Sequence, residues 1–475
     1  MAGVRQKTSP TREKRVGAIG AWSGQVEALL KEATQVAPDG SSDLESRIRT
    51  YAQDLPSDVE HALELLRTID GLGIVVHGPA GCSAALHGAN KAAGPWVVTN
   101  LTERDSIMGS DAKLRKAIQD IHKTYRPLAI AVVSTPVVAI NNDDIDSVTE
   151  ELKDELSIPV VAIYTDGFRS KIGSTGQDVA VHSLIKHLLP LRRRSEGTHL
   201  NLLAVRETRA DVEQFQRLLS EIGVESVVFP RFASVTQAQK LSEAKVSIGL
   251  DPDTSDYAGT AFEEVYGIPF LKAPAPLGSK GTADWFEAVG AAFGKSEEAQ
   301  KLVERESKRI QPALHAAETF AGTRLFVNLP ASLAFAFGAV AKELGLTIVG
   351  TKAPWAASRH AQVLTDLVAH APETPVLVGE GQAFEEVNLL GKIKPDLYIT
   401  AGVAPIHVLR AGIPVVNLDD VSLLGFQGLE RLARAIERAL ANRSLSRFLS
   451  EGGEEPYDPS WLKKSVHWYI KQEVK

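Results

Sequence analysis

The sequence of 475 residues has a single cysteine, Cys82. One cysteine cannot form an intrachain disulfide, so we expect a reducing, cytoplasmic setting in which Cys82 is a thiol or a ligand. Apolar runs of about 18 residues are missing too, so we expect no membrane-spanning helix. Basic residues are not in excess: the formal net charge is -7 at pH 7, which gives no reason to expect a nucleic acid or an anionic membrane as partner.

Short nucleotide- and metal-binding motifs are also missing. The sequence contains no GxxxxGKS or GxxxxGKT loop, no GxGxxG, no CxxC and no HExxH. We therefore expect any ATP hydrolysis linked to this protein to take place on another chain. The basic start MAGVRQKTSPTREKR is followed by no apolar segment, which predicts a flexible arm rather than a secretory signal.

Short runs rich in β-branched residues recur along the chain between turn residues. They alternate with helix-like segments such as KLRKAIQDIHKTY, DVEQFQRLLSEIG and GLERLARAIERALAN. This alternation predicts buried parallel strands in βαβ units, and hence an α/β fold. The predicted strands are Leu72–His77, Leu128–Ser134, Val160–Thr165, Leu202–Val205, Val246–Leu250, Leu325–Leu329, Val376–Val378 and Leu397–Thr400.

The length and the loop-like stretches predict several domains. We expect a polar N-terminal arm and helical segment over 1–60, followed by three doubly wound, Rossmann-like subdomains with parallel sheets over 61–195, 196–320 and 321–475. The first subdomain carries Cys82, and the last ends in helices. Open sheets of this type bind ligands beyond the carboxyl ends of their strands, which is where Cys82 is expected.

Cys82 follows an apolar run in the stretch VVHGPAGCSAALHG. Gly78 and Gly81 free the backbone to turn and Pro79 fixes one torsion, so we expect Cys82 at the start of a helix. Free N–H groups at such a position favour the thiolate, which binds soft metals. Two other interpretations stay open. A lone cysteine is more often a small buried side chain, and it can also be a nucleophile beside a histidine, which is the least favoured interpretation.

Several stretches together resemble, in order and spacing, the nitrogenase component 1 superfamily. That superfamily includes the nitrogenase subunits, the scaffold subunits of cofactor assembly, the protochlorophyllide and chlorophyllide reductases and methylthio-alkane reductase. Its members have three α/β subdomains, pair with a homologous chain and hold an iron–sulfur cluster between the two chains. The resemblance is carried by VVHGPAGC and by Thr99–Ile118, Val132–Val148, Ala244–Phe270, Pro276–Phe286 and Leu423–Ile436.

The resemblance implies that Cys82 is the cluster ligand of the HGPxGC motif. Gly78, Pro79 and Gly81 would shape the backbone around the cluster, or simply form a tight turn. The resemblance places a second cluster cysteine in the stretch VVSTPVVAINNDD, where this chain has Pro136, a residue without a ligating side chain.

A third cluster cysteine is expected upstream, in the stretch SDVEHAL, where His61 and Asp58 are the candidate non-cysteine ligands. The stretch SDVEHAL is also typical of a helix start with a serine cap and an acidic first turn, and this is the interpretation that we favour.

Asp251 lies where the resemblance places the cysteine that anchors the active-site cofactor of nitrogenase. An aspartate in the stretch DPDTSD is more often a turn former or a helix cap than a ligand. The anchoring histidine has no counterpart near GFQG, where the chain has Leu423 and Leu424. We therefore expect this chain not to hold such a cofactor in that manner.

A single cysteine cannot complete an iron–sulfur cluster, because a four-iron cluster normally takes four protein ligands and a P-cluster takes more. We therefore expect Cys82 to share its cluster, 4Fe–4S or P-cluster-like, with a homologous subunit in an αβ unit that doubles to α2β2. A symmetric homodimer with non-cysteine donors is the alternative.

The implied function is that of a subunit of a nitrogenase-like reductase, in which an ATP-dependent iron protein passes electrons through the shared cluster. Two alternatives stay open. The chain is a scaffold on which a complex metallocofactor is assembled, or a cluster-free binding module of the same fold.

Overall fold

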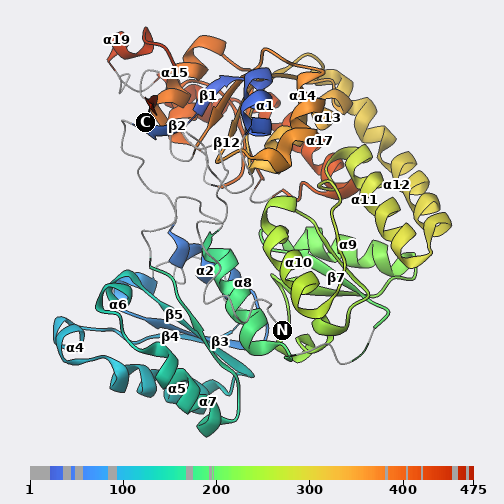
Figure 1. The fold of residues 1–475 in the computed structure, drawn as a ribbon. Coiled ribbons are helices and arrows are strands. Elements are labelled where there is room, and N and C mark those ends of the chain that lie inside the picture. The colour runs from blue at the N-terminus through green and yellow to red at the C-terminus, as the bar shows by residue number, and fades with distance from the viewer. Residues whose placement is uncertain are drawn as a thin grey trace. The chain divides into compact units, whose positions relative to one another are not determined.

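A computed structural model describes residues 22–35, 44–48, 57–83, 94–166, 175–191, 195, 197–379, 383–402, 405–418, 421–451, 458–466 and 470–474. The described residues form an α/β protein (Figure 1) that divides into two compact units. Unit 1 contains Pro56–Val212 and Leu219–Lys272, and unit 2 contains Lys14–Leu55, Glu213–Leu218 and Ala273–Lys475, as far as they are described. The described part of the chain has no helix that is both long and apolar enough to span a membrane.

The first sheet of unit 1 has four parallel strands in the order β4-β3-β5-β6. Ile74 and Val76 of β3 pack in one core with α2 and α8, whereas Val75 packs in a second core with α5 and α7, so helices cover both faces (Figure 1). The strands are β3 (Leu72–His77), β4 (Trp96–Val98), β5 (Ala129–Ser134) and β6 (Val160–Ile163). The helices are α2 (Asp58–Leu66), α4 (Glu103–Met108), α5 (Asp111–Tyr125), α6 (Pro136–Asn141), α7 (Ile145–Leu156) and α8 (Thr175–Leu188).

The second sheet of unit 1 is also parallel, with the order β10-β9-β7-β8. It shares the larger core of the unit with the first sheet, because Leu203 and Phe229 belong to the same apolar cluster as Ile74. The strands are β7 (Leu200–Ala204), β8 (Ser226–Pro230), β9 (Val246–Gly249) and β10 (Phe270–Leu271), and the helices are α9 (Arg209–Glu221) and α10 (Pro252–Tyr266).

The third sheet lies in unit 2 and has six strands in the order β1-β13-β12-β11-β14-β15, all parallel except β1. A separate strand pair joins β2 (Leu44–Ile48) to β16 (Ile470–Val474). The other strands are β1 (Trp22–Gln25), β11 (Arg324–Asn328), β12 (Thr347–Ala353), β13 (Pro375–Val378), β14 (Leu397–Thr400) and β15 (Val415–Asn417). The helices are α1 (Val26–Gln35), α11 (Gly278–Phe293), α12 (Ser296–Ala317), α13 (Ala331–Glu343), α14 (Ala361–Val368), α15 (Ala383–Ile393), α16 (Ile406–Arg410), α17 (Gly425–Ala441), α18 (Ser444–Glu451) and α19 (Pro459–Leu462).

The N-terminal region contains the helix α1, as expected, and in addition two strands that were not predicted. Trp22–Gln25 is a strand that pairs antiparallel with Pro375–Val378, and Leu44–Ile48 is a second strand. The cause is long-range pairing, because WSGQ has no apolar run of its own and becomes a strand only beside β13. All eight predicted strands are confirmed with small shifts at their ends. The boundaries proposed at 60, 195 and 320 stay predictions.

The first parallel strand of each sheet is an inner strand, and this order creates a crevice. From β3, β7 and β11 the chain proceeds to a neighbour on one side, which is β4, β8 or β12. A later strand, β5, β9 or β14, then pairs on the other side of this inner strand. Because the connections diverge there, the carboxyl ends of the inner strand and this later strand flank a crevice, which is the usual ligand site of an open α/β sheet.

The crevice of the third sheet holds a buried polar network. Lys352 Nζ donates to Glu386 Oε2 over 2.5 Å, and the Tyr398 hydroxyl donates to the other oxygen of Glu386. Asn328 Nδ2 donates to the Tyr398 hydroxyl over 2.8 Å, and His407 Nε2 lies 3.5 Å from Glu386 Oε2. Burial raises the pKa of Glu386, but the charge of Lys352 and the contact with His407 outweigh it and lower the pKa to about 2.

The ion pair between Lys352 and Glu386 gives a stability prediction. Replacement by Lys352→Ala leaves a buried carboxylate without its cation and is expected to lower the free energy of unfolding by about 3–5 kcal/mol, measured by urea denaturation. The matched control is Lys280→Ala, which removes an exposed pair with Asp284 and should change stability little. Equal effects of the two substitutions would contradict the structural role of the buried pair.

Candidate functional site

Cys82 lies just beyond the carboxyl end of β3, an inner strand of the first sheet. The strand ends at His77, and a 3-10 turn over Ala80–Ser83 follows, in which Cys82 N donates to Pro79 O over 3.1 Å. The predicted α-helix start is therefore a 3-10 turn within the described residues.

The Cys82 side chain is partly buried and packs against the larger core of unit 1. It lies at the crevice between β3 and β5, beyond the carboxyl ends of the strands, where the sequence predicted it. The thiol therefore combines the packing role that a lone cysteine usually has with access from the carboxyl edge of the sheet.

His77 anchors this edge and is not a partner for Cys82. Its ring is fully buried, with Nδ1 3.1 Å from Thr99 Oγ1 and Nε2 3.1 Å from Ser110 Oγ. Asp143 Oδ2 lies 3.5 Å from the same Nε2. Burial lowers the pKa of His77, which outweighs the opposing charge of Asp143, so the ring is neutral at pH 7. The ring holds the end of β3 in place by hydrogen bonds.

The two glycines of the motif have different roles. A Cβ at Gly78 would overlap Thr135 Oγ1, which itself donates to His77 O over 2.8 Å. Gly78 is therefore required where β3 and β5 approach each other. A Cβ at Gly81 would have no atom within 4 Å, so the space beside Gly81, next to Cys82, is open.

Pro136 starts a helix where the resemblance expects a second cluster cysteine. It stands in the first turn of α6, after the fully buried Thr135, and proline is favoured there because its fixed torsion suits the helix and its missing N–H is not needed. This crevice position therefore carries a helix start and offers no ligand.

Asp58 and His61 lie in the first turn of α2. Ser57 caps this helix in a capping box, with Ser57 N donating to Glu60 Oε2 over 2.6 Å, so the predicted serine-capped helix start is confirmed. Asp58 is buried and accepts a hydrogen bond from Asp166 N over 3.3 Å. Among the described residues, no three or more His, Cys, Asp or Glu side chains gather as a metal site, so the structure does not bring Cys82, Asp58 and His61 together in one. Their ligand roles stay predictions.

The crevice of the second sheet holds two buried carboxyl groups. Glu207 follows β7, and its Oε2 accepts hydrogen bonds from Val205 N over 2.6 Å and Arg206 N over 2.9 Å. The other oxygen of Glu207, Oε1, is buried without a partner. Asp251 caps α10 by accepting from Asp253 N over 2.9 Å, which confirms the helix-cap interpretation.

The two carboxyl groups are weaker acids than usual, because their pKa values are raised. Burial raises the pKa of Glu207 to about 7, and the charge of Asp251 adds to this effect. Burial and the charge of Asp253 raise the pKa of Asp251 to about 6. Glu207 was not predicted from the sequence. It stands just beyond a predicted buried strand, and the same position relative to a strand drew attention to Cys82.

A sequence profile described as nitrogenase component 1 type oxidoreductase matches residues 61–441. The chain belongs to this family. Within the match lie Cys82 and all three crevices, so the family assignment covers the whole candidate site.

Relatives in the nitrogenase component 1 family carry two kinds of name. The nitrogenase iron-molybdenum cofactor biosynthesis protein NifE of Methanococcus maripaludis is 24% identical over 77% of this chain and 78% of its own length. The nitrogenase molybdenum-iron protein alpha chain of the same organism is 24% identical over 81% of this chain and 85% of its own. Equal identity to both does not separate a catalytic from a biosynthetic role, and neither name supports methylthio-alkane reductase.

The fold of the family is also found in a solved structure described as nitrogenase Cp1 at pH 5. It superposes with a TM-score of 0.75 at 17% identity, and the match covers 96% of this chain and 99% of that chain. The expected α/β architecture with three parallel sheets is therefore confirmed.

Gly78→Ala is expected to lower the free energy of unfolding by about 1–3 kcal/mol, because the added methyl group overlaps Thr135 in a packed crevice. Gly81→Ala is the matched control and should change stability by less than about 0.5 kcal/mol, since open space surrounds it. Urea denaturation of both variants tests this. A destabilised Gly81→Ala beside a normal Gly78→Ala would be the opposite of what the crevice geometry predicts.

Glu207 makes stability depend on pH. Its pKa is raised from 4.5 to about 7 on folding, so the folded state binds the proton more tightly, and stability falls as the pH rises through this range. Wild type should lose roughly 3 kcal/mol more than Glu207→Gln between about pH 4.5 and pH 7. Urea denaturation at several pH values measures this, with the exposed Glu263→Gln as control. Parallel pH profiles of wild type and Glu207→Gln would show that Glu207 is ionised in the folded protein.

Proposed function

We propose that this chain is a subunit of a nitrogenase-like oxidoreductase and supplies Cys82 to an iron–sulfur cluster shared with a homologous subunit. The observation that carries the proposal is the position of Cys82, in the motif HGPAGC at the carboxyl edge of the first sheet and inside the region that matches the family. The pair forms an αβ unit that doubles to α2β2.

The donor set of this chain supplies one thiolate to such a cluster, with Asp58 and His61 as further candidate ligands. Cys82 is the only thiol of the chain, and the described residues contain no group of three metal-binding side chains. The remaining ligands therefore come from the partner, because a four-iron cluster takes four.

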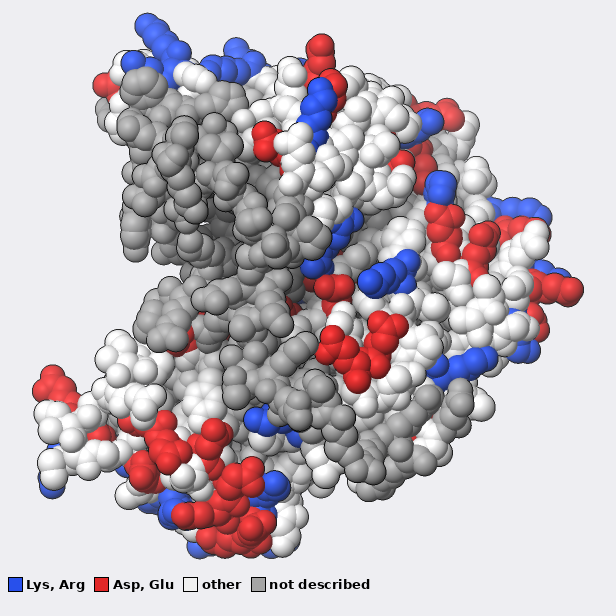
Figure 2. Space-filling model, in the orientation of Figure 1, with Lys and Arg blue, Asp and Glu red and all other residues white. Residues whose placement is uncertain are grey.

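An exposed apolar patch at the same edge supports a partner chain. Ile107 and Met108 of α4 are 81% and 75% exposed, and Ile140 of α6 is 72% exposed. Both helices follow strands of the first sheet and contact each other, so they lie at its carboxyl edge with Cys82. In Figure 2 the atoms over α6 are mostly uncharged, whereas α4 also shows charged side chains and acidic side chains gather over α5 and α7. Exposed apolar patches of this kind mark protein interfaces.

The residues of this chain position the cluster ligand and part of the docking face. His77 and Thr135 hold the end of β3, Gly78 lets the two central strands approach, and Cys82 binds the cluster. When bound, the cluster supplies one-electron transfer. Electrons come from a separate ATP-hydrolysing iron protein, which agrees with the missing P-loop in this chain.

A second candidate function is a scaffold subunit for metallocofactor assembly. It is favoured by the relative named as a cofactor biosynthesis protein, and by Asp251, which serves as a helix cap at the position where the resemblance places a cofactor-anchoring cysteine. A purified complex that binds a metallocofactor and releases it, without turnover under reducing conditions, supports the scaffold. Turnover of a substrate supports the reductase.

The test is to co-express this chain with a homologous subunit, purify the complex without oxygen and measure iron and the electron paramagnetic resonance signal. Cys82→Ala is expected to lose most of the cluster iron, because a thiolate ligand is removed. Lys280→Ala, an exposed substitution in unit 2 away from the motif, is the control and should keep the iron. Equal iron in wild type and Cys82→Ala, or none in either, would reject the ligand role and favour the cluster-free binding module.

A further inference from the structure

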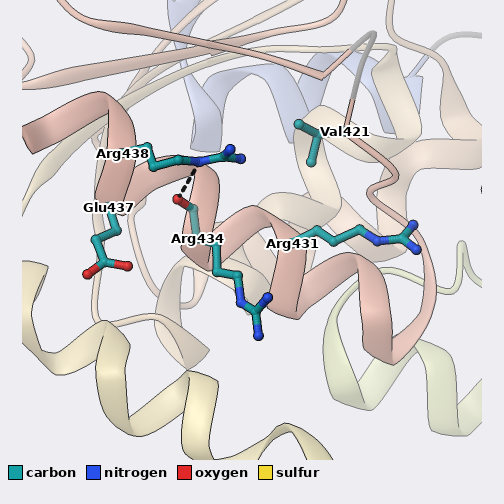
Figure 3. Close-up of a pocket in the computed structure, with 5 residues that line it drawn as sticks. All are labelled: Val421, Arg431, Arg434, Glu437 and Arg438. Atoms are coloured by element: carbon teal, nitrogen blue, oxygen red, sulfur yellow. Dashed lines mark hydrogen bonds between the residues drawn. The ribbon is translucent and has the colours of Figure 1, made fainter. Parts of the chain in front are cut away.

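A hollow of about 490 Å³ lies beside α17 in unit 2 (Figure 3). Its volume is within the range typical of small-molecule sites. It belongs to none of the three crevices, and neither the motif around Cys82 nor the buried carboxyl groups take part in it. The lining residues are Val421, Arg431, Arg434, Glu437 and Arg438.

Three of the five lining residues are arginines on one face of α17. Arg431, Arg434 and Arg438 are spaced by three and four residues, which places them on the same side of a helix. Arg431 and Arg438 are seven residues apart, or about 10 Å along the helix. In Figure 3 the side chains of both extend toward the side of the helix where Val421 lies.

The arginines of the hollow differ in their ion pairing. Arg434 pairs with Glu430 over 2.6 Å, and Arg309 of α12 pairs with the same carboxylate over 3.3 Å. Arg431 donates only to Gln427 Oε1 over 3.5 Å, and Arg438 Nε donates to the Arg434 carbonyl oxygen over 3.3 Å. Among the described residues neither guanidinium has a carboxylate partner.

As far as the residues are described, the charge that lines the hollow is therefore positive and partly uncompensated. Three guanidinium groups face one lining carboxylate, Glu437, and Arg434 is already neutralised by Glu430. A guanidinium group binds a phosphate group through two parallel hydrogen bonds, and two such groups about two helical turns apart suit a ligand with more than one anionic group.

We propose that this hollow binds a polyphosphate through Arg431 and Arg438. Among the described residues that line the hollow, none has an aromatic ring on which a nucleobase could stack, so we expect the site to recognise the phosphate chain and not a base. The bound phosphate chain is either free polyphosphate or the triphosphate of a nucleotide. The site is independent of the cluster role of Cys82, so the two proposals can fail separately.

The test is isothermal titration calorimetry of the full-length protein with tripolyphosphate, ATP and AMP. Tripolyphosphate should bind at one saturable site, ATP should bind no more tightly, and AMP should bind at least tenfold more weakly. Arg431→Ala/Arg438→Ala should weaken tripolyphosphate binding at least tenfold. The control Arg443→Ala/Arg447→Ala, which removes two exposed arginines that do not line the hollow, should leave binding unchanged.

Several results would overturn the proposal. They are the absence of saturable tripolyphosphate binding, unchanged binding by the Arg431→Ala/Arg438→Ala variant, and an equal loss in the control variant, which would indicate only general attraction to positive charge. ATP binding much tighter than tripolyphosphate would overturn recognition of the phosphate chain alone. If the double variant does not fold, Arg438→Ala serves instead, because its exposed side chain contributes little to packing, and it should still weaken binding severalfold.

Discussion

The order in which strands pair determines where chemistry can take place in this protein. The first parallel strand of each sheet is an inner strand, and the parallel strands added later lie on both sides of it. The carboxyl ends of β3 and β5, of β7 and β9, and of β11 and β14 therefore flank three crevices. Cys82 lies at the first, the buried Glu207 and Asp251 at the second, and the network around Glu386 at the third. Polar groups are concentrated there because the rest of each strand is packed between helices.

Much of the fold could be predicted from the sequence, because buried parallel strands are apolar runs between amphipathic helices. Leu397–Thr400 was predicted to the residue. Three of the strands that were missed have local reasons: β4 has three residues, β8 ends in a proline, and β12 is interrupted by Gly350 and Lys352. The pairing of Trp22–Gln25 with β13 joins residues about 350 positions apart, and no local pattern predicts such contacts.

The candidate site was predictable only in part. The glycine–proline turn and Cys82 could be found because they follow a recognisable strand, and Asp251 and Ser57 could be interpreted as caps from their neighbours. The different roles of Gly78 and Gly81 depend on how closely Thr135 approaches, which only the folded structure reveals. The raised pKa of Glu207 likewise depends on burial beside Asp251, a residue more than forty positions away in the sequence.

The central claim is that this chain holds a cluster only together with a homologous subunit. Native mass spectrometry and iron analysis of the anaerobically purified chain, alone and co-expressed with such a subunit, test it most directly. The account predicts that the chain alone carries no cluster iron and that the complex contains both subunits and cluster iron. A complete cluster on the chain alone, or an iron-free complex, would contradict it.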